Sequence, residues 1–349
     1  MQLQIYTPAM APPRLGIVGT GFISVSHARM LKRATTPFVR AKAFDTNARR
    51  AEGFAKRGGW TAASSLDEVL DSCDAVLVLT WTSEHRAIVE QAAARGLHVF
   101  CEKPLATSFA DALAMVEAVR DAGVVHQCGL VLRWSPACVV ARALAYEAEA
   151  GDVMAVMLRD DQFLPVQGHY ASTWRGDLSK SGGGVLIEHS VHDMDLLEWI
   201  LGPIANVRAH ISYRDGLIGI DDVAAATLVG RNGGVATLTS VWHDNVARES
   251  NRYLEIICQR RMITVSGDDW FGPVTWQDPD GVVHHIGPDE AVERATNLLG
   301  ATPNPDDGFL RAITSGTDAM PDLTLALRAQ RLVEAGYLSH NRGGVVVDV

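Results

Sequence analysis

The chain has 349 residues, a length that predicts two domains because one hydrophobic core seldom grows so large. It carries 31 Lys and Arg against 41 Asp and Glu, for a net charge of −10, and it has no run of basic residues. This balance argues against nucleic acid or an anionic membrane surface as the main partner. No apolar run reaches the length of a membrane span.

The first 13 residues have neither a basic segment nor a continuous apolar segment, so we expect an irregular leader and not a signal peptide. The five cysteines form no C-x-x-C pair, and their odd number indicates reduced, buried thiols. These features predict a cytoplasmic protein.

Residues 14–130 alternate short apolar segments with helical patterns, as in a parallel sheet covered on both faces. We therefore predict a doubly wound Rossmann domain. The predicted strands are Leu15–Val18, Val39–Phe44, Ala75–Leu79, His98–Cys101 and Val124–Cys128. The predicted helices are Ile23–Lys32, Ala48–Arg57, Glu84–Arg95 and Phe109–Ala122.

A glycine-rich turn joins the first strand to the first helix. Gly19 and Gly21 form a G-x-G pattern that lets backbone N–H groups approach a pyrophosphate, and Ser24 replaces the third glycine. The pattern is informative because it follows a strand and opens a helix. The predicted cofactor-binding residues here are Gly19, Thr20, Gly21, Phe22 and Ile23.

Asp45 ends the second strand, where a carboxylate can accept hydrogen bonds from the adenosine ribose. It favours NAD, because a 2′-phosphate would meet a like charge. Arg49 and Arg50 follow closely and offer the alternative of NADP. Asp45 is also a candidate N-cap for the second helix.

Two later strands end in polar segments that should border the nicotinamide, because ligands bind beyond the carboxyl ends of parallel strands. The first contains Thr80, Trp81 and His85, and the second contains Glu102 and Lys103. Pro104 restricts the preceding lysine and allows a cis bond between the two. All five residues are predicted cofactor contacts.

The stretch Ser181–Trp199 combines three glycines with a helical pattern. On a continuous helix, Glu188, His192, Asp195 and Trp199 would share one stripe, and a polar stripe on a buried helix marks a candidate site. An ordinary surface Glu–His pair is the competing interpretation. A metal site including His189 is disfavoured, because the His-Glu-x-x-His order is absent.

Residues 131–349 open with a predicted helix, Ala137–Glu147, and then become rich in strands, which predicts an open, mostly antiparallel sheet in an α+β domain. The predicted strands are Val153–Asp160, Val207–Tyr213, Val223–Leu228, Val235–Trp242, Tyr253–Cys258, Met262–Val265, Val274–Gln277 and Val282–Ile286. We expect the last helices, Asp307–Ser315 and Leu323–His340, to brace the domain junction.

Arg175 beside Trp174 is the strongest candidate for substrate contact, because a fork of donors next to an aromatic face suits a polyhydroxylated ring. The other predicted substrate-binding residues are Arg133, Asp160 and His169, with Gln162 and His243 as further candidates.

The glycine-rich turn, Glu102-Lys103-Pro104 and the three glycines before Glu188 and His192, in this order and spacing, resemble the glucose–fructose oxidoreductase, inositol dehydrogenase and MocA family. The resemblance covers nearly the whole chain from Arg14. It implies that Lys103, Glu188 and His192 are catalytic and that NAD or NADP carries hydride. It also implies association through the outer face of the second sheet. Because an exposed open sheet is an aggregation risk unless it is paired, we expect a homodimer or homotetramer.

Two departures from the family pattern concern the site. Glu188 stands where inositol dehydrogenase-like members usually have Asp, so its reach must differ. Thr80-Trp81-Thr82 stands where the family often has Thr-Pro-Asn.

The expected function is oxidation of a secondary alcohol on a sugar, inositol or related polyol, or the reverse reduction. His192 would act as general base, Lys103 would stabilise the alkoxide, and Glu188 would orient His192. The alternatives are an NAD-dependent glycoside hydrolase and a nucleotide-sensing regulator without catalysis.

Overall fold

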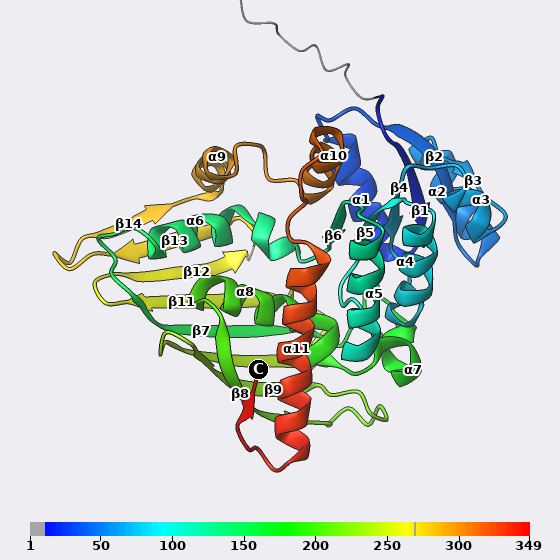
Figure 1. Cartoon of the computed structure of the whole chain (residues 1–349). Coiled ribbons are helices and arrows are strands. Elements are labelled where there is room, and N and C mark those ends of the chain that lie inside the picture. The colour runs from blue at the N-terminus through cyan, green and yellow to red at the C-terminus, as the bar shows by residue number, and fades with distance from the viewer. Residues whose placement is uncertain (1–10, 269) are drawn as a thin grey trace, which may run out of the picture.

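The computed structural model describes residues 11–268 and 270–349 (Figure 1). Of the predicted leader, residues 1–10 lie outside the described residues, and residues 11–13 have no regular secondary structure. Two sheets form the framework. A six-stranded sheet lies in the part of the chain that comes first, and a nine-stranded sheet lies beside it in the part that follows.

The first sheet is parallel throughout, in the order β3-β2-β1-β4-β5-β6, so the predicted Rossmann fold is confirmed. Its strands are β1 (Arg14–Val18), β2 (Val39–Phe44), β3 (Thr61–Ala62), β4 (Ala75–Val78), β5 (His98–Cys101) and β6 (His126–Cys128). Its helices are α1 (Phe22–Lys32), α2 (Ala48–Gly58), α3 (Leu66–Leu70), α4 (His85–Ala94) and α5 (Phe109–Asp121). Strand β3 and helix α3 were not predicted, because they are too short to show a hydrophobic period.

Both faces of this sheet are buried, as the continuous apolar strands predicted. In β4, Val76 and Val78 belong to one hydrophobic cluster, while Ala75 and Leu77 belong to the other. Side chains alternate between the faces of a strand, so the two clusters lie on opposite sides of the sheet.

The second sheet has the order β14-β13-β12-β11-β7-β10-β9-β8-β15, and in it only the β7–β10 pair is parallel. Its strands are β7 (Val153–Phe163), β8 (Ile204–Ser212), β9 (Val223–Gly230), β10 (Val235–His243), β11 (Asn251–Cys258), β12 (Met262–Asp268), β13 (Gly272–Gln277), β14 (Val283–Ile286) and β15 (Val347–Asp348). The mostly antiparallel sheet is thus confirmed.

One face of the second sheet carries helices, and three of them, α6, α8 and α11, lie across it in Figure 1. The helices that follow β6 are α6 (Pro136–Ala145), α7 (Leu178–Ser181), α8 (Val191–Leu201), α9 (Pro288–Leu299), α10 (Pro305–Ser315) and α11 (Leu323–Asn341). Helix α9 was not predicted, because its buried face contains only the small side chains Ala291 and Ala295. None of the described helices is both long and apolar enough to cross a membrane.

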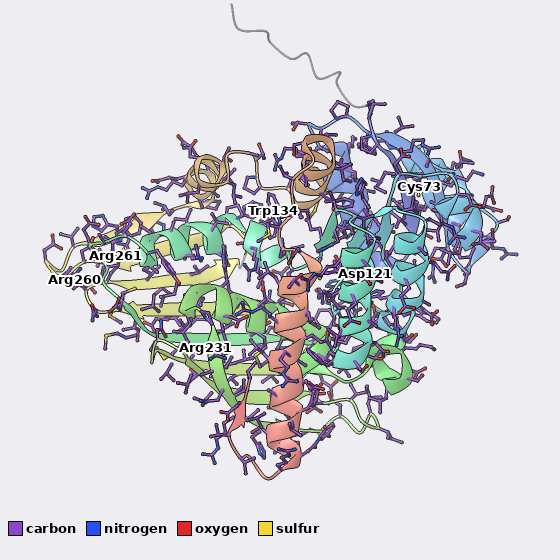
Figure 2. All side chains as sticks on the ribbon, viewed as in Figure 1. Cys73, Asp121, Trp134, Arg231, Arg260 and Arg261 are labelled. Atoms are coloured by element: carbon purple, nitrogen blue, oxygen red, sulfur yellow. The ribbon has the colours of Figure 1, made fainter. Side chains whose placement is uncertain are left out.

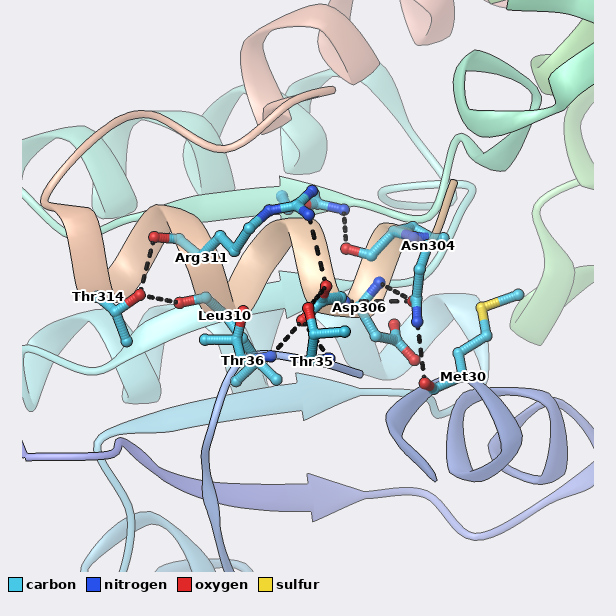
Figure 3. A network of polar contacts seen from close by, with 11 residues as sticks. Met30, Thr35, Thr36, Asn304, Asp306, Leu310, Arg311 and Thr314 are labelled. Atoms are coloured by element: carbon cyan, nitrogen blue, oxygen red, sulfur yellow. Dashed lines mark hydrogen bonds and ion pairs between the residues drawn. The ribbon is translucent and has the colours of Figure 1, made fainter. Parts of the chain in front are cut away.

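Helix α10 packs against the first domain although it lies late in the sequence. Phe309, Leu310 and Ile313 join the hydrophobic cluster of β1 and β5. The Asp307 carboxylate accepts hydrogen bonds from the backbone N–H groups of Thr35 and Thr36, at 3.1 and 2.8 Å (Figure 3). Helix α10 therefore ties a late segment of the chain to the first domain.

Trp134 lies at the junction between the two sheets (Figure 2). Its indole N–H donates to the Met320 carbonyl at 3.0 Å, and a Cβ on Gly308 would come within 2.5 Å of its ring. The start of the second domain, helix α10 and the approach to α11 thus pack together at one point.

Candidate active site

A cavity of about 940 Å³ lies between the two domains. Its wall contains ten of the eleven predicted cofactor contacts, namely Gly19, Thr20, Gly21, Phe22, Ile23, Asp45, Thr80, Trp81, Glu102 and Lys103. The second domain contributes Trp174, Arg175, Glu188 and His192. The tertiary structure therefore brings the glycine-rich turn and the three predicted catalytic side chains to one cavity.

The glycine-rich turn has the form of a phosphate cradle. Gly19 has φ +93°, and a Cβ there would come within 2.5 Å of the Leu79 carbonyl oxygen. A Cβ on Gly21 would meet no atom within 4 Å, so the cavity is open at this point. Gly21 is the N-cap of α1, and no described side chain caps it, which leaves N–H groups of the first turn for an anion.

Asp45 is held beside this turn. One carboxylate oxygen accepts hydrogen bonds from Thr20 N and Thr20 Oγ1 at 2.9 and 3.1 Å, and the other accepts from Asn47 N at 2.9 Å. Arg50 Nη1 lies 3.8 Å from Asp45 Oδ2. The N-cap of α2 is Asn47, so Asp45 does not cap this helix. Asp45 instead lines the cavity.

Lys103 reaches from the first domain to the second. Its Nζ donates to the backbone carbonyl of Glu188 at 2.7 Å, and the Lys103–Pro104 bond is cis, as the sequence allowed. Burial lowers the pKa of the Lys103 ammonium, and the nearby Arg175 guanidinium lowers it further.

His85 is the one predicted cofactor contact that is absent from the cavity wall among the described residues. Its ring nitrogens contact the carbonyls of Pro104, Leu105 and Thr80 at 3.0, 3.2 and 3.3 Å. His85 therefore links the two strand-end segments behind the cavity.

Each of the three glycines before Glu188 makes a different close approach. A Cβ on Gly182 would lie 2.7 Å from Thr107 Cα, one on Gly183 would lie 2.5 Å from Tyr337 Oη, and one on Gly184 would lie 1.8 Å from the Asp221 carbonyl oxygen. The backbone therefore packs closely against another part of the chain at all three positions, which a residue with a Cβ would prevent.

The predicted continuous helix from Glu188 to Trp199 is wrong. Residues Val185–His189 form a π-helical turn, in which Ser190 N donates to the Val185 carbonyl, and α8 starts only at Val191. The expected stripe is therefore broken between Glu188 and His192. The backbone N–H groups at the start of this turn, those of Gly184, Val185 and Leu186, are bound by Asp221, a residue outside it.

Both carboxylate oxygens of Glu188 are engaged away from His192. Oε1 accepts from Thr82 Oγ1 at 2.7 Å, and Oε2 accepts from Arg175 Nε at 3.0 Å. The two departures from the family pattern, Glu188 and Thr82, thus contact each other across the domain boundary. The expected orienting contact between Glu188 and His192 is not found among the described residues.

His192 lies on the cavity wall with its Nδ1 buried and without a hydrogen-bond partner among the described residues. Burial lowers the pKa of His192 well below its usual value, and the Lys103 charge lowers it further. The imidazole is therefore neutral at physiological pH, the state that a general base requires.

Arg175 lies with its guanidinium carbon 4.4 Å from the centre of the Trp174 ring, and both line the cavity. Three other predicted substrate contacts, Arg133, Asp160 and His169, are not part of the cavity wall in the described part of the chain. Arg133 pairs with Asp195 at 2.7 Å, and His169 packs its ring 4.2 Å from that of Tyr170.

Asp160 belongs to a buried charged cluster behind the cavity wall. Its Oδ2 lies 2.7 Å from His189 Nε2 and 2.8 Å from Arg252 Nη2, and Arg252 Nε lies 2.9 Å from Asp193 Oδ1. Burial and the neighbouring Asp160 raise the pKa of Asp193 to about 7. His189 and Arg252 line the cavity, and sequence reasoning did not single out Arg252.

Of the two further substrate candidates, only one lines the cavity. Gln162 lines it, while His243 lies outside it and approaches Asp161 at 3.7 Å. Tyr170, Ser172 and Trp242 also line it and were not predicted, because they lie in a loop and a sheet that carry no motif. The described residues contain no group of three or more His, Cys, Asp or Glu placed to hold a metal.

The fold and site define a two-domain protein with a dinucleotide-type cradle facing a wall of ionisable side chains. Residues 13–130 match the oxidoreductase family with an NAD-binding Rossmann fold, and residues 139–264 match the C-terminal domain of the same Gfo/Idh/MocA family. The chain belongs to the Gfo/Idh/MocA family of oxidoreductases.

Curated relatives include 1,5-anhydro-D-fructose reductase of Ensifer adhaerens, 32% identical over 60% of this chain and 63% of the relative. Myo-inositol 2-dehydrogenase of Thermotoga maritima is 27% identical over 65% of this chain and 64% of the relative. The matches span about half to two thirds of the length of the first such relatives.

Solved structures share the fold across the whole chain. An oxidoreductase domain protein from Kribbella flavida has a TM-score of 0.87 at 23% identity, covering 97% of this chain and 100% of that chain. Levoglucosan dehydrogenase in complex with NADH has a TM-score of 0.86 at 20% identity, covering 97% and 99%.

Proposed function

We propose that this protein is an NAD-dependent oxidoreductase that interconverts a secondary alcohol and a ketone on a sugar, inositol or related polyol. The observation that carries the proposal is that one cavity is lined by the glycine-rich turn and Lys103 of the first domain and by His192 of the second. The names of the relatives, among them a reductase of an anhydro sugar and an inositol dehydrogenase, support this substrate class.

The residues around the turn fit NAD. The space beside Gly21 and the uncapped start of α1 suit a pyrophosphate, and the Asp45 carboxylate suits the ribose hydroxyls. Arg50, also on the cavity wall, keeps NADP as the alternative. When bound, NAD supplies an acceptor for the hydride that leaves the alcohol carbon.

In the proposed mechanism, the neutral His192 takes the proton from the substrate hydroxyl. The Lys103 ammonium stabilises the alkoxide that develops on the oxygen. Glu188 holds Arg175 and the Thr82 segment in place around the reacting carbon, in contrast to the histidine-orienting role expected from sequence. In the reduction direction, His192 returns the proton to the carbonyl oxygen.

Trp174 and Arg175 are proposed to bind the substrate ring, since an aromatic face and a fork of N–H donors complement the apolar and hydroxyl surfaces of a polyol. Arg175 is already bonded to Glu188 through Nε, so we expect the rest of the guanidinium to contact hydroxyl groups.

The outer face of the nine-stranded sheet is proposed to join two or more copies of the chain. Met157, Val235, Tyr253 and Met262 are between 37% and 45% exposed there, and an open sheet with exposed apolar side chains is prone to pairing. Five free, buried cysteines support a reducing compartment, and we propose a cytoplasmic location.

The test is NADH formation at 340 nm by the purified protein with NAD, and separately with NADP, near pH 9. The panel contains inositols, aldoses, sugar acids and anhydro sugars. We expect reduction of NAD with at least one polyol. Release of free sugar from a glycoside without net NADH would instead support the hydrolase alternative, and tight NAD binding without any turnover would support a sensor.

A further inference from the structure

Asp221 binds the beginning of the π-helical turn from outside. The residue is fully buried, and its Oδ1 and Oδ2 accept hydrogen bonds from Gly184 N and Leu186 N at 2.7 and 2.9 Å. Its main-chain carbonyl accepts from Val185 N at 2.7 Å. One residue therefore satisfies three successive backbone donors that begin a helical turn.

Tyr337 of α11 supports the same carboxylate. Its Oη donates to Asp221 Oδ1 at 2.7 Å. A Cβ on Gly183 would come within 2.5 Å of the Tyr337 Oη. A Cβ on Gly184 would collide with the Asp221 backbone. Two of the three glycines are thus required by the approach of Asp221 and Tyr337, and not by a ligand.

The position of this turn sets the geometry of the site. Glu188 N donates to the Gly184 carbonyl, and the Glu188 carbonyl is the acceptor for Lys103 Nζ. His192 follows at the start of α8, two residues after Ser190, where the turn closes. A shift of Gly184 would consequently displace the acceptor of Lys103 and the origin of the helix that carries His192.

Resting on the proposed function, we propose that Asp221, supported by Tyr337, is a positioning unit that fixes Lys103 and His192 at their reacting distance. Neither Asp221 nor Tyr337 belongs to the described cavity wall, so they act through the π turn and not on the substrate. The last long helix of the chain thereby contributes to catalysis without contacting the reacting atoms.

The main test variant is Asp221→Asn. The amide keeps the size of the side chain but places an NH₂ group against a backbone N–H group, so one of the two carboxylate contacts is lost. We expect kcat to fall about 10- to 100-fold, because a displacement of about 1 Å at reacting groups has effects of that order. The Kd for NAD should stay within about twofold, since the glycine-rich turn lies on the other domain.

Asp222→Asn is the matched control. Asp222 is the next residue and is equally buried, but its carboxylate accepts from Arg214 N and Asp215 N in a different loop. Both contacts go to Oδ2, so an amide oxygen in that place can keep them, and we expect Asp222→Asn to retain kcat within about twofold. An equal loss of kcat in both variants would show that general destabilisation explains the loss in Asp221→Asn, and it would overturn the proposal.

Hydrogen exchange gives a readout that needs no substrate. Exchange at the amides of Gly184, Val185 and Leu186 should be faster by about tenfold or more in Asp221→Asn, and unchanged in Asp222→Asn. Wild-type exchange rates at these amides in Asp221→Asn would contradict the positioning role of Asp221, whatever the activity of the protein. An inactive wild-type enzyme with protected amides would instead contradict only the proposed function.

Tyr337→Phe is the gentler variant. Removing its hydroxyl takes one hydrogen bond from the Asp221 carboxylate but leaves the contacts of Asp221 with the backbone in place. We therefore expect kcat to fall only about three- to tenfold, with NAD binding retained. Because both residues act through one carboxylate, the double variant should lose less than the product of the single effects. Independent, multiplying effects would show that Tyr337 does not act through Asp221.

Discussion

His192 is the residue on which the proposed chemistry depends most. His192→Ala should lower the rate of NADH formation about 10²- to 10⁴-fold, because the substrate hydroxyl then loses its general base. NAD binding, measured by calorimetry, should be retained. His285→Ala, an exposed histidine on β14, is the control and should be fully active. Near wild-type turnover in His192→Ala would exclude the assignment.

The pH profile of kcat follows from the same pair of residues. The base must be unprotonated, and the pKa of His192 lies well below 6.5, so the acidic limb should fall below pH 6.5. Lys103 must be charged, and burial lowers its pKa from 10.5, so the alkaline limb should appear below pH 10.5.

Lys103→Arg identifies the origin of the alkaline limb. A guanidinium does not titrate in this range, so the variant should keep some activity and lose the limb. The control is Lys180→Arg, which should leave the limb unchanged. Lys180 is outside the described cavity wall, and its Nζ lies 4.6 Å from the centre of the Trp81 ring. An unaltered limb in Lys103→Arg would assign it to another group.

At the scale of elements, α10 is held to the first domain through a buried histidine of α1. His27 Nδ1 lies 2.8 Å from Asp306 Oδ1, and Nε2 lies 3.2 Å from Glu102 Oε1. Burial alone would lower the pKa of His27, but the Asp306 and Glu102 carboxylates raise it to about 10. The imidazolium therefore connects α1, α10 and the segment that carries Lys103.

The stabilisation by His27 should depend on pH. Its folded pKa lies above the unfolded value, so the contribution is fully present below about pH 6.5 and is lost as the pH rises toward 10. His27→Gln should lower the free energy of unfolding by about 3 to 5 kcal/mol at pH 6, as for a broken buried ion pair, and by less at pH 10. Urea denaturation at both pH values measures this.

The control for His27→Gln is the exposed His285→Gln, which should change the free energy of unfolding little at either pH. An equal loss at pH 6 and pH 10 in His27→Gln would show that His27 is not charged in the folded protein.

At the scale of the whole molecule, the uncovered face of the nine-stranded sheet predicts self-association. Met157→Asp with Tyr253→Asp places two carboxylates on this face and should convert the oligomer to a monomer, as measured by light scattering on a sizing column. Leu298→Asp on α9 exposes a carboxylate elsewhere and should leave the oligomer intact. A monomeric wild-type chain would contradict the association.

Much of the framework could be predicted because it is encoded locally. The period of apolar residues located β2 and β5 with the observed bounds, and the glycine spacing located the turn at Gly19. Short elements such as β3 were missed, since two residues show no period. The motif order also indicated the family, because each motif is short and can be recognised from neighbouring residues.

The sequence by itself determined the class of fold and the residue types of the site, because both depend on short-range spacing and on side-chain chemistry. Only the tertiary structure decided which contacts those residues make. Among the described residues, Glu188 contacts Thr82 and Arg175 in place of His192. Asp221 and Tyr337, from segments far along the chain, hold the start of the π turn before His192. Contacts of this kind depend on packing between distant segments, which local spacing does not record.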